Sequence, residues 1–72
     1  MKSIDMRDRG GPMVSVQLAE ELRSRAPGEL VEIVTDRQSV VDYLLDWCRE
    51  TSNPLISIDT IQGDLRVVVA KT

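Results

Sequence analysis

With 72 residues and a net charge of −3, the chain has the length of one small domain and lacks the positive field that broad, nonspecific nucleic-acid binding requires. Hydrophobic residues make up 42% and charged residues 29%, a composition that excludes a disordered chain and indicates a folded globular one. Histidine is absent and there is one cysteine, which removes the commonest general base, the commonest metal ligand and any internal disulfide.

The chain also lacks the apolar runs that direct proteins to membranes. No stretch approaches the ~20 consecutive apolar residues of a membrane span. Residues 1–5 contain no apolar segment like that of a signal peptide. We therefore expect one cytoplasmic domain over residues 1–72, with no membrane contact, no metal ion and no cofactor.

The first half of the chain predicts two strands with a helix between them. A short strand is predicted at residues 3–6 and is followed by a polar loop that ends in Gly-Gly-Pro at 10–12. Proline is favoured at the first position of a helix, and apolar side chains then recur at every fourth residue, so we predict a helix over 13–25. The Ala-Pro-Gly at 26–28 ends this helix. β-branched residues predict a strand at 29–35.

The second half predicts a helix and a hairpin. Ser39 is a candidate N-cap, and Asp42, three residues later, completes a weak capping box. A broad apolar surface follows until Thr-Ser-Asn-Pro at 51–54 ends the helix. The strands at 55–61 and 65–70 are joined by a tight Gln-Gly-Asp turn.

Two helices and four strands of this length predict an α/β (α+β) two-layer sandwich. The order is β-α-β-α-β-β, with a four-stranded mixed sheet and both helices on one face. The first two strands can be parallel, and the last two form an antiparallel hairpin. We expect the other face of the sheet to be open and to carry Arg66, Val68 and Ala70, where apolar content favours a partner or self-association.

Several motifs occur in an order that is informative as a whole. Residues 5–14 read Asp-Met-Arg-Asp-Arg-Gly-Gly-Pro-Met-Val and open the first helix. The second strand ends in Asp36, the pair Trp47 and Cys48 lies late in the second helix, and the closing hairpin ends in Lys71. This pattern resembles the TusA/SirA-like family of small sulfur-carrier proteins over nearly the whole chain.

That family's signature is Asp-x-Arg-Gly, two residues, then Cys-Pro-x-Pro at the start of the first helix. The chain matches it at Asp5, Arg7 and Pro12, and departs from it at Asp8, Gly11 and Val14. In the family, the cysteine that Gly11 replaces carries a persulfide and passes sulfur to a partner. A thiolate there is stabilised by the free N–H groups and the helix dipole. Glycine cannot hold sulfur, so the resemblance implies the fold without a catalytic residue.

The loop and helix start remain a candidate binding site, which consists of Arg7, Arg9, Gly10, Gly11, Pro12 and Met13. Free N–H groups flanked by two arginines favour a phosphate, sulfate or thiosulfonate. An equally good interpretation is that Gly11 merely serves as an acceptable N-cap before Pro12. A nucleic-acid site is weakly supported, because the chain lacks aromatic residues interleaved with basic ones.

Cys48 is the only remaining sulfur acceptor. One hypothesis makes it a relocated carrier thiol. The favoured interpretation makes it a core residue, because free cysteines are commonly buried and an interior thiol lacks an electropositive setting. Tyr43 and Trp47 are interpreted as packing residues.

The leading hypothesis is a noncatalytic TusA-like protein that binds a sulfur-transfer enzyme or a true carrier in a regulatory role. The alternatives are an active sulfur carrier that uses Cys48 and a small anion- or RNA-binding module. If the loop is otherwise intact, we expect Gly11→Cys to restore some sulfur acceptance.

Overall fold

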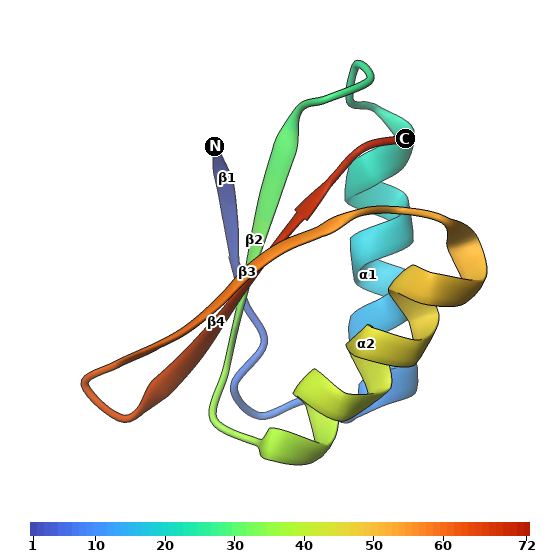
Figure 1. Cartoon of the computed structure of the whole chain (residues 1–72). Helices are drawn as coiled ribbons and strands as arrows, with labels where there is room; N and C mark the ends of the chain where they lie inside the picture. The colour runs from blue at the N-terminus through green and yellow to red at the C-terminus, as the bar shows by residue number, and fades with distance from the viewer.

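The computed structural model describes residues 1–72 and confirms the predicted order of elements and the α+β class. The elements are β1 (Lys2–Asp5), α1 (Gly11–Arg23), β2 (Leu30–Thr35), α2 (Gln38–Thr51), β3 (Leu55–Ile61) and β4 (Asp64–Ala70). The four strands form one sheet in the order β1-β2-β4-β3. Figure 1 shows both helices on the same side of this sheet. Neither helix has the length and apolar composition needed to cross a membrane.

The sheet is mixed, as the connections require. β1 and β2 are parallel because α1 carries the chain back between them, whereas β2–β4 and β3–β4 are antiparallel. β2 and β4 occupy the centre, where a strand has a neighbouring strand at each edge. The run Val67–Ala70 suits that position, since none of its four side chains is more than 8% exposed.

The hydrophobic core lies between the helices and the sheet. On α1 it uses the predicted every-fourth-residue stripe, and on α2 it uses the opposite side from the polar residues. The core residues are Met6, Val14, Leu18, Leu22, Val31, Ile33, Val40, Val41, Leu44, Cys48, Val67 and Val69. Aliphatic side chains therefore build the core, as the scarcity of aromatics predicts.

Both helices begin earlier than predicted. α1 already includes Gly11, because Pro12 fits within the first turn of a helix, and it ends at Arg23. The Nζ of Lys71 donates to the Leu22 carbonyl at 2.8 Å and satisfies that end of the helix. The N-cap of α2 is Arg37, without a side-chain hydrogen bond.

The capping box predicted for α2 is wrong. Ser39 lies inside the first turn of the helix, so it cannot act as the N-cap. The Asp42 carboxylate instead accepts a hydrogen bond from Nε2 of Gln38 at 3.1 Å, a pair four residues apart on one helix face. No side-chain cap therefore satisfies the first amides of α2.

The sheet face away from the helices is less apolar than predicted. Val68 and Ala70 are 8% and 7% exposed, because they lie on a central strand between covered neighbours. Beside them, the Glu32 carboxylate accepts hydrogen bonds from Arg66 at 3.1 Å and from Ser3 at 2.8 Å. This face therefore exposes a small polar network of Ser3, Glu32 and Arg66, while Val68 and Ala70 are buried.

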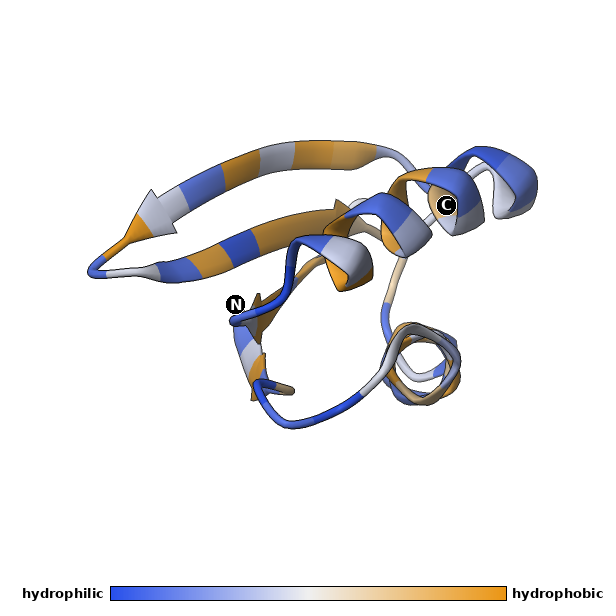
Figure 2. Cartoon of the chain, turned by 90° about the horizontal axis from the view of Figure 1, so that it is seen from below, coloured by the Kyte–Doolittle hydropathy of each residue, from blue (hydrophilic) through white to orange (hydrophobic).

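The β3–β4 hairpin extends past the helices, with polar and apolar residues alternating along it (Figure 2). Its turn uses Gln62 and Gly63, with φ values of 52° and 84°, and two left-handed residues match the twist of an antiparallel hairpin. The pairing with β4 shifts between Leu55 and Ser57, so Ile56 forms a bulge that interrupts the predicted alternation of β3.

Candidate functional site

The loop between β1 and α1 is held by one buried residue. Met6 is 4% exposed, and its N–H donates to the Val34 carbonyl at 2.8 Å, which extends the β1–β2 pairing by one step. The Arg9 N–H then donates to the Met6 carbonyl at 3.2 Å and turns the chain toward the helix. The Met6 anchor therefore fixes where α1 begins.

The start of α1 is uncapped by side chains. The N-cap is Gly10 in an extended conformation, one residue before the predicted Gly11, and its carbonyl accepts from the Val14 N–H at 3.0 Å. No side chain bonds to the first-turn amides, and Pro12 has no N–H to satisfy. The helix end is therefore as bare as the sequence suggests.

Gly11 lies directly against the ring of Tyr43. A Cβ atom at Gly11 would lie 2.6 Å from Cγ of Tyr43 and 2.9 Å from its Cβ and Cδ2. Carbon atoms in contact normally sit about 3.5–4.0 Å apart, so no side chain of any kind fits here unless Tyr43 moves. The tyrosine hydroxyl lies 3.5 Å from Oγ of Ser15, one turn further along α1. The space that a carrier cysteine would need is thus filled by an aromatic ring.

Gly10 provides the contrast. A Cβ atom built there meets nothing within 4 Å, and its φ of −85° suits any residue. Of the two adjacent glycines, only Gly11 is required by its surroundings. The sequence predicts Tyr43 only as a packing residue. Its contact with Gly11 could not be predicted, because it depends on how α1 and α2 cross.

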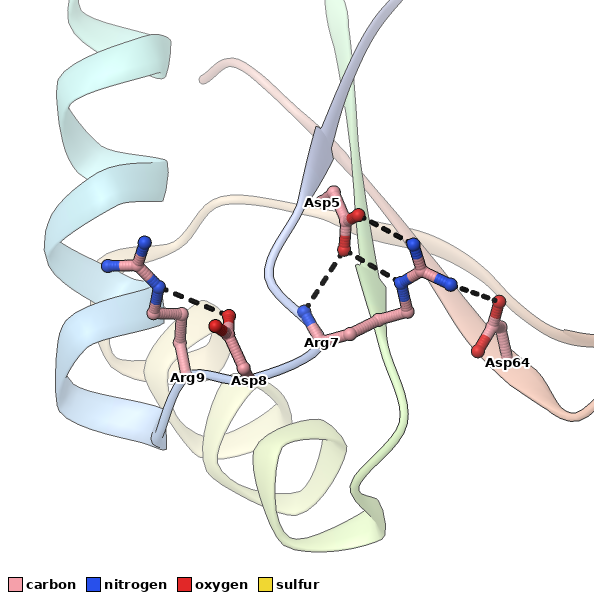
Figure 3. A network of polar contacts seen from close by, with 5 residues as sticks. All are labelled: Asp5, Arg7, Asp8, Arg9 and Asp64. Carbon is pink, nitrogen blue, oxygen red and sulfur yellow. Dashed lines mark hydrogen bonds and ion pairs between the residues drawn. The ribbon is translucent and has the colours of Figure 1, made fainter.

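Arg7 is bound by carboxylates on both sides (Figure 3). Its Nε and Nη2 donate to the two carboxylate oxygens of Asp5 at 2.9 Å and 2.8 Å, and Nη1 lies 3.5 Å from Asp64 of β4. The hydrogen bond from Arg7 lowers the pKa of Asp5, and the same contact raises the pKa of Arg7. The bidentate pair with Asp5 fixes the guanidinium, and its contact with Asp64 connects the loop to the β3–β4 hairpin.

Arg9 is placed differently. Its Nε lies 3.3 Å from Asp8, and Figure 3 shows its guanidinium on the α1 side of the loop while that of Arg7 points toward the hairpin. The two cations therefore do not converge on the bare helix start. Each has a carboxylate beside it, which leaves little net positive charge to attract an anion.

The first turns of α1 also present apolar side chains to solvent. Met13 is 50% exposed and Val16 is 62% exposed. They are three residues apart, so they lie on one face of the helix. We call Met13 and Val16 the α1 patch. The sequence prediction included Met13 but not Val16, which reads as an ordinary member of the helical pattern.

Cys48 belongs to the core. Its side chain is 4% exposed, and burial raises the pKa of its thiol, so it stays protonated at neutral pH. Its backbone carbonyl accepts from the N–H of Asn53 at 3.1 Å, where Ser52 in a left-handed conformation ends α2. This burial favours the neutral thiol over the thiolate that sulfur chemistry requires.

Comparison with known proteins supports the resemblance that the motifs suggested. The family model described as Sulfurtransferase TusA matches residues 2–71, which is almost the whole chain. A comparison with curated proteins finds no match. The family model covers the loop, both helices and all four strands. The chain therefore belongs to the TusA sulfurtransferase family, whose members act in sulfur transfer.

Proposed function

We propose that this protein is a noncatalytic member of the TusA family that binds a sulfur-transfer enzyme or a sulfur carrier and regulates sulfur transfer without accepting sulfur. The observation that carries the proposal is the Tyr43 ring in the space beside Gly11, 2.6 Å from where a Cβ atom would be. If Gly11 stood in open space, the site would lack only its thiol. Because the Tyr43 ring packs against Gly11, a cysteine does not fit in this arrangement, which supports a role without sulfur acceptance.

Cys48 supports the same proposal. Sulfur transfer from a persulfide needs a partner thiolate to reach the outer sulfur atom. A side chain that is 4% exposed in the core gives no such access, and its raised pKa opposes formation of the attacking thiolate. Cys48 borders a surface cavity beside Arg49 and Leu55, and a role as a relocated carrier would require that cavity to open further.

The loop and the α1 patch are the surface that we propose for docking. Arg7 and Arg9 supply polar groups at its edge, while Met13 and Val16 supply exposed apolar area. A mixed surface of this kind suits a transient protein interface. We place this role in the cytoplasm, where thiols are kept reduced and persulfides can be exchanged.

Intact mass spectrometry tests the absence of sulfur transfer. The chain and its Cys48→Ala variant are incubated with a cysteine desulfurase and cysteine, beside an active TusA-family carrier. We expect the carrier to gain sulfur and both forms of this chain to gain none. A sulfur adduct that disappears in Cys48→Ala would overturn the proposal and establish the relocated carrier.

Competition tests the docking. The chain is added in excess to a desulfurase and an active carrier, and the rate of carrier persulfide formation is measured. We expect the chain to slow this reaction and Met13→Lys to relieve the inhibition. The matched control is Ile61→Lys, because Ile61 is 47% exposed compared with 50% for Met13 and lies on β3. Equal inhibition by both variants would remove the α1 patch from the proposed interface.

A further inference from the structure

The face of α2 beside the start of α1 carries a shallow groove that combines aromatic and acidic side chains. Its lining consists of Tyr43, Asp46, Trp47 and Glu50, so it contains both aromatic residues of the chain and two carboxylates. These positions are three or four residues apart, which puts all of them on one face of the helix. No basic residue lines it. We call this surface the α2 groove.

The negative charges of the α2 groove are poorly neutralised. The ion pair of Asp46 is a contact of 3.6 Å with Arg49, between side chains that are 72% and 80% exposed, and such pairs contribute little. None of the ion pairs of the protein involves Glu50. Two carboxylates one helical turn apart also repel each other. A cation placed between them would therefore be attracted by both.

Tyr43 and Trp47 in the lining indicate which kind of side chain could bind in the α2 groove. A cationic side chain gains energy over the face of tryptophan or tyrosine, and arginine can also stack its flat guanidinium there. Nucleic acid and anionic lipid would be repelled by the carboxylates. We infer that the α2 groove receives an arginine or lysine side chain from a basic segment of a partner protein.

This inference does not depend on whether the chain accepts sulfur, because neither Gly11 nor Cys48 lines the α2 groove. Tyr43 nevertheless belongs to two features at once, since it lines the α2 groove and also covers Gly11. A partner docked at the start of α1 is therefore within reach of the groove. Each proposal can be refuted without the other. The proposed function is tested by intact mass and by competition with a carrier, and the α2 groove is tested by peptide binding.

Trp47 provides the measurement, because it is the only tryptophan of the chain and lines the groove. The full chain is titrated with an acetylated and amidated Gly-Arg-Gly-Arg-Gly peptide while Trp47 fluorescence is recorded. The matched peptide has glutamate in place of arginine. We expect a saturable change with the arginine peptide, weakened by added salt, and none with the glutamate peptide.

Two single substitutions separate the groove from general charge attraction. Glu50→Gln and Asp59→Asn each remove one negative charge from a net charge of −3, and neither carboxylate takes part in an ion pair. Asp59 is exposed on β3, outside the groove. We expect Glu50→Gln to weaken peptide binding about threefold or more, the scale of one exposed charge contact, and Asp59→Asn to leave it unchanged. Unsaturable binding, equal binding of the two peptides, or equal losses in the two variants would overturn the inference.

Discussion

The contact between Gly11 and Tyr43 leads to a prediction that can be measured as a free energy of unfolding. In Gly11→Cys the new Cβ atom starts 2.6 Å from Cγ of Tyr43, so the ring must retreat by about 1 Å to reach ordinary contact distance. Overpacking of this kind costs about 1–3 kcal/mol. Replacing glycine also lowers the conformational entropy of the unfolded chain, which stabilises the folded state by ~0.4–1 kcal/mol. We expect a net loss of roughly 1–2 kcal/mol of stability.

The second arm of the experiment removes the ring. Tyr43→Ala alone should cost about 2–3 kcal/mol, less than a fully buried aromatic residue would, because Tyr43 is 39% exposed. In that background the new cysteine has room, so Gly11→Cys should cost little or nothing. The coupling between the two positions should therefore be about 1–3 kcal/mol and favourable to the double variant.

Urea unfolding, followed by Trp47 fluorescence and by circular dichroism, gives all four free energies of the cycle. The control is Gly10→Cys, whose Cβ meets nothing within 4 Å. The loss of a favoured N-cap residue and the lower entropy of the unfolded chain offset each other there, so its cost should stay below about 0.5 kcal/mol. The reasoning is refuted if Gly11→Cys costs no more than this control and is additive with Tyr43→Ala. For sulfur acceptance we now predict that Gly11→Cys is active only when Tyr43 is removed as well, in place of the sequence-based expectation for Gly11→Cys alone.

Three further predictions concern the thiol, the loop and the core. Because burial raises the pKa of Cys48 above 9.0, the unfolded thiol ionises first, so stability should fall as pH rises past that value. Cys48→Ala should remove this decline, as measured by urea midpoints at neutral pH and at about pH 10. The Asp5 carboxyl should titrate below 3.8, so its stabilising contribution is present above that pH and lost below it, and NMR should show its pKa rising in Arg7→Gln. Leu44 is fully buried in the core, so Leu44→Ala should lower the free energy of unfolding by about 2–5 kcal/mol, measured with urea. This is a large share of the ~4–11 kcal/mol expected for a chain of this length. A loss under about 1 kcal/mol would contradict the packing described.

The local patterns were sufficient to predict the elements and their order. The four-residue recurrence of Val14, Leu18 and Leu22 predicted the buried side of α1, and all three residues lie in the core. The β-branched runs predicted the strands, because these residues pack well on a pleated surface. The predictions are wrong at the start of α2, where the sequence motif predicts Ser39 as the N-cap although the helix begins at Gln38. Backbone entry angles are set by neighbouring elements, so a capping motif alone does not determine them.

The fold class, the family resemblance and the absence of a thiol at Gly11 follow from residue types in order along the chain, so they can be read without coordinates. What occupies the space beside Gly11 depends on how distant segments pack against one another. Gly11 and Tyr43 lie 32 positions apart and meet because α1 and α2 pack on the same face of the sheet. The burial of Val68 and Ala70 was likewise decided by the position of β4 at the centre of the sheet, since period-two alternation does not say which strands are central.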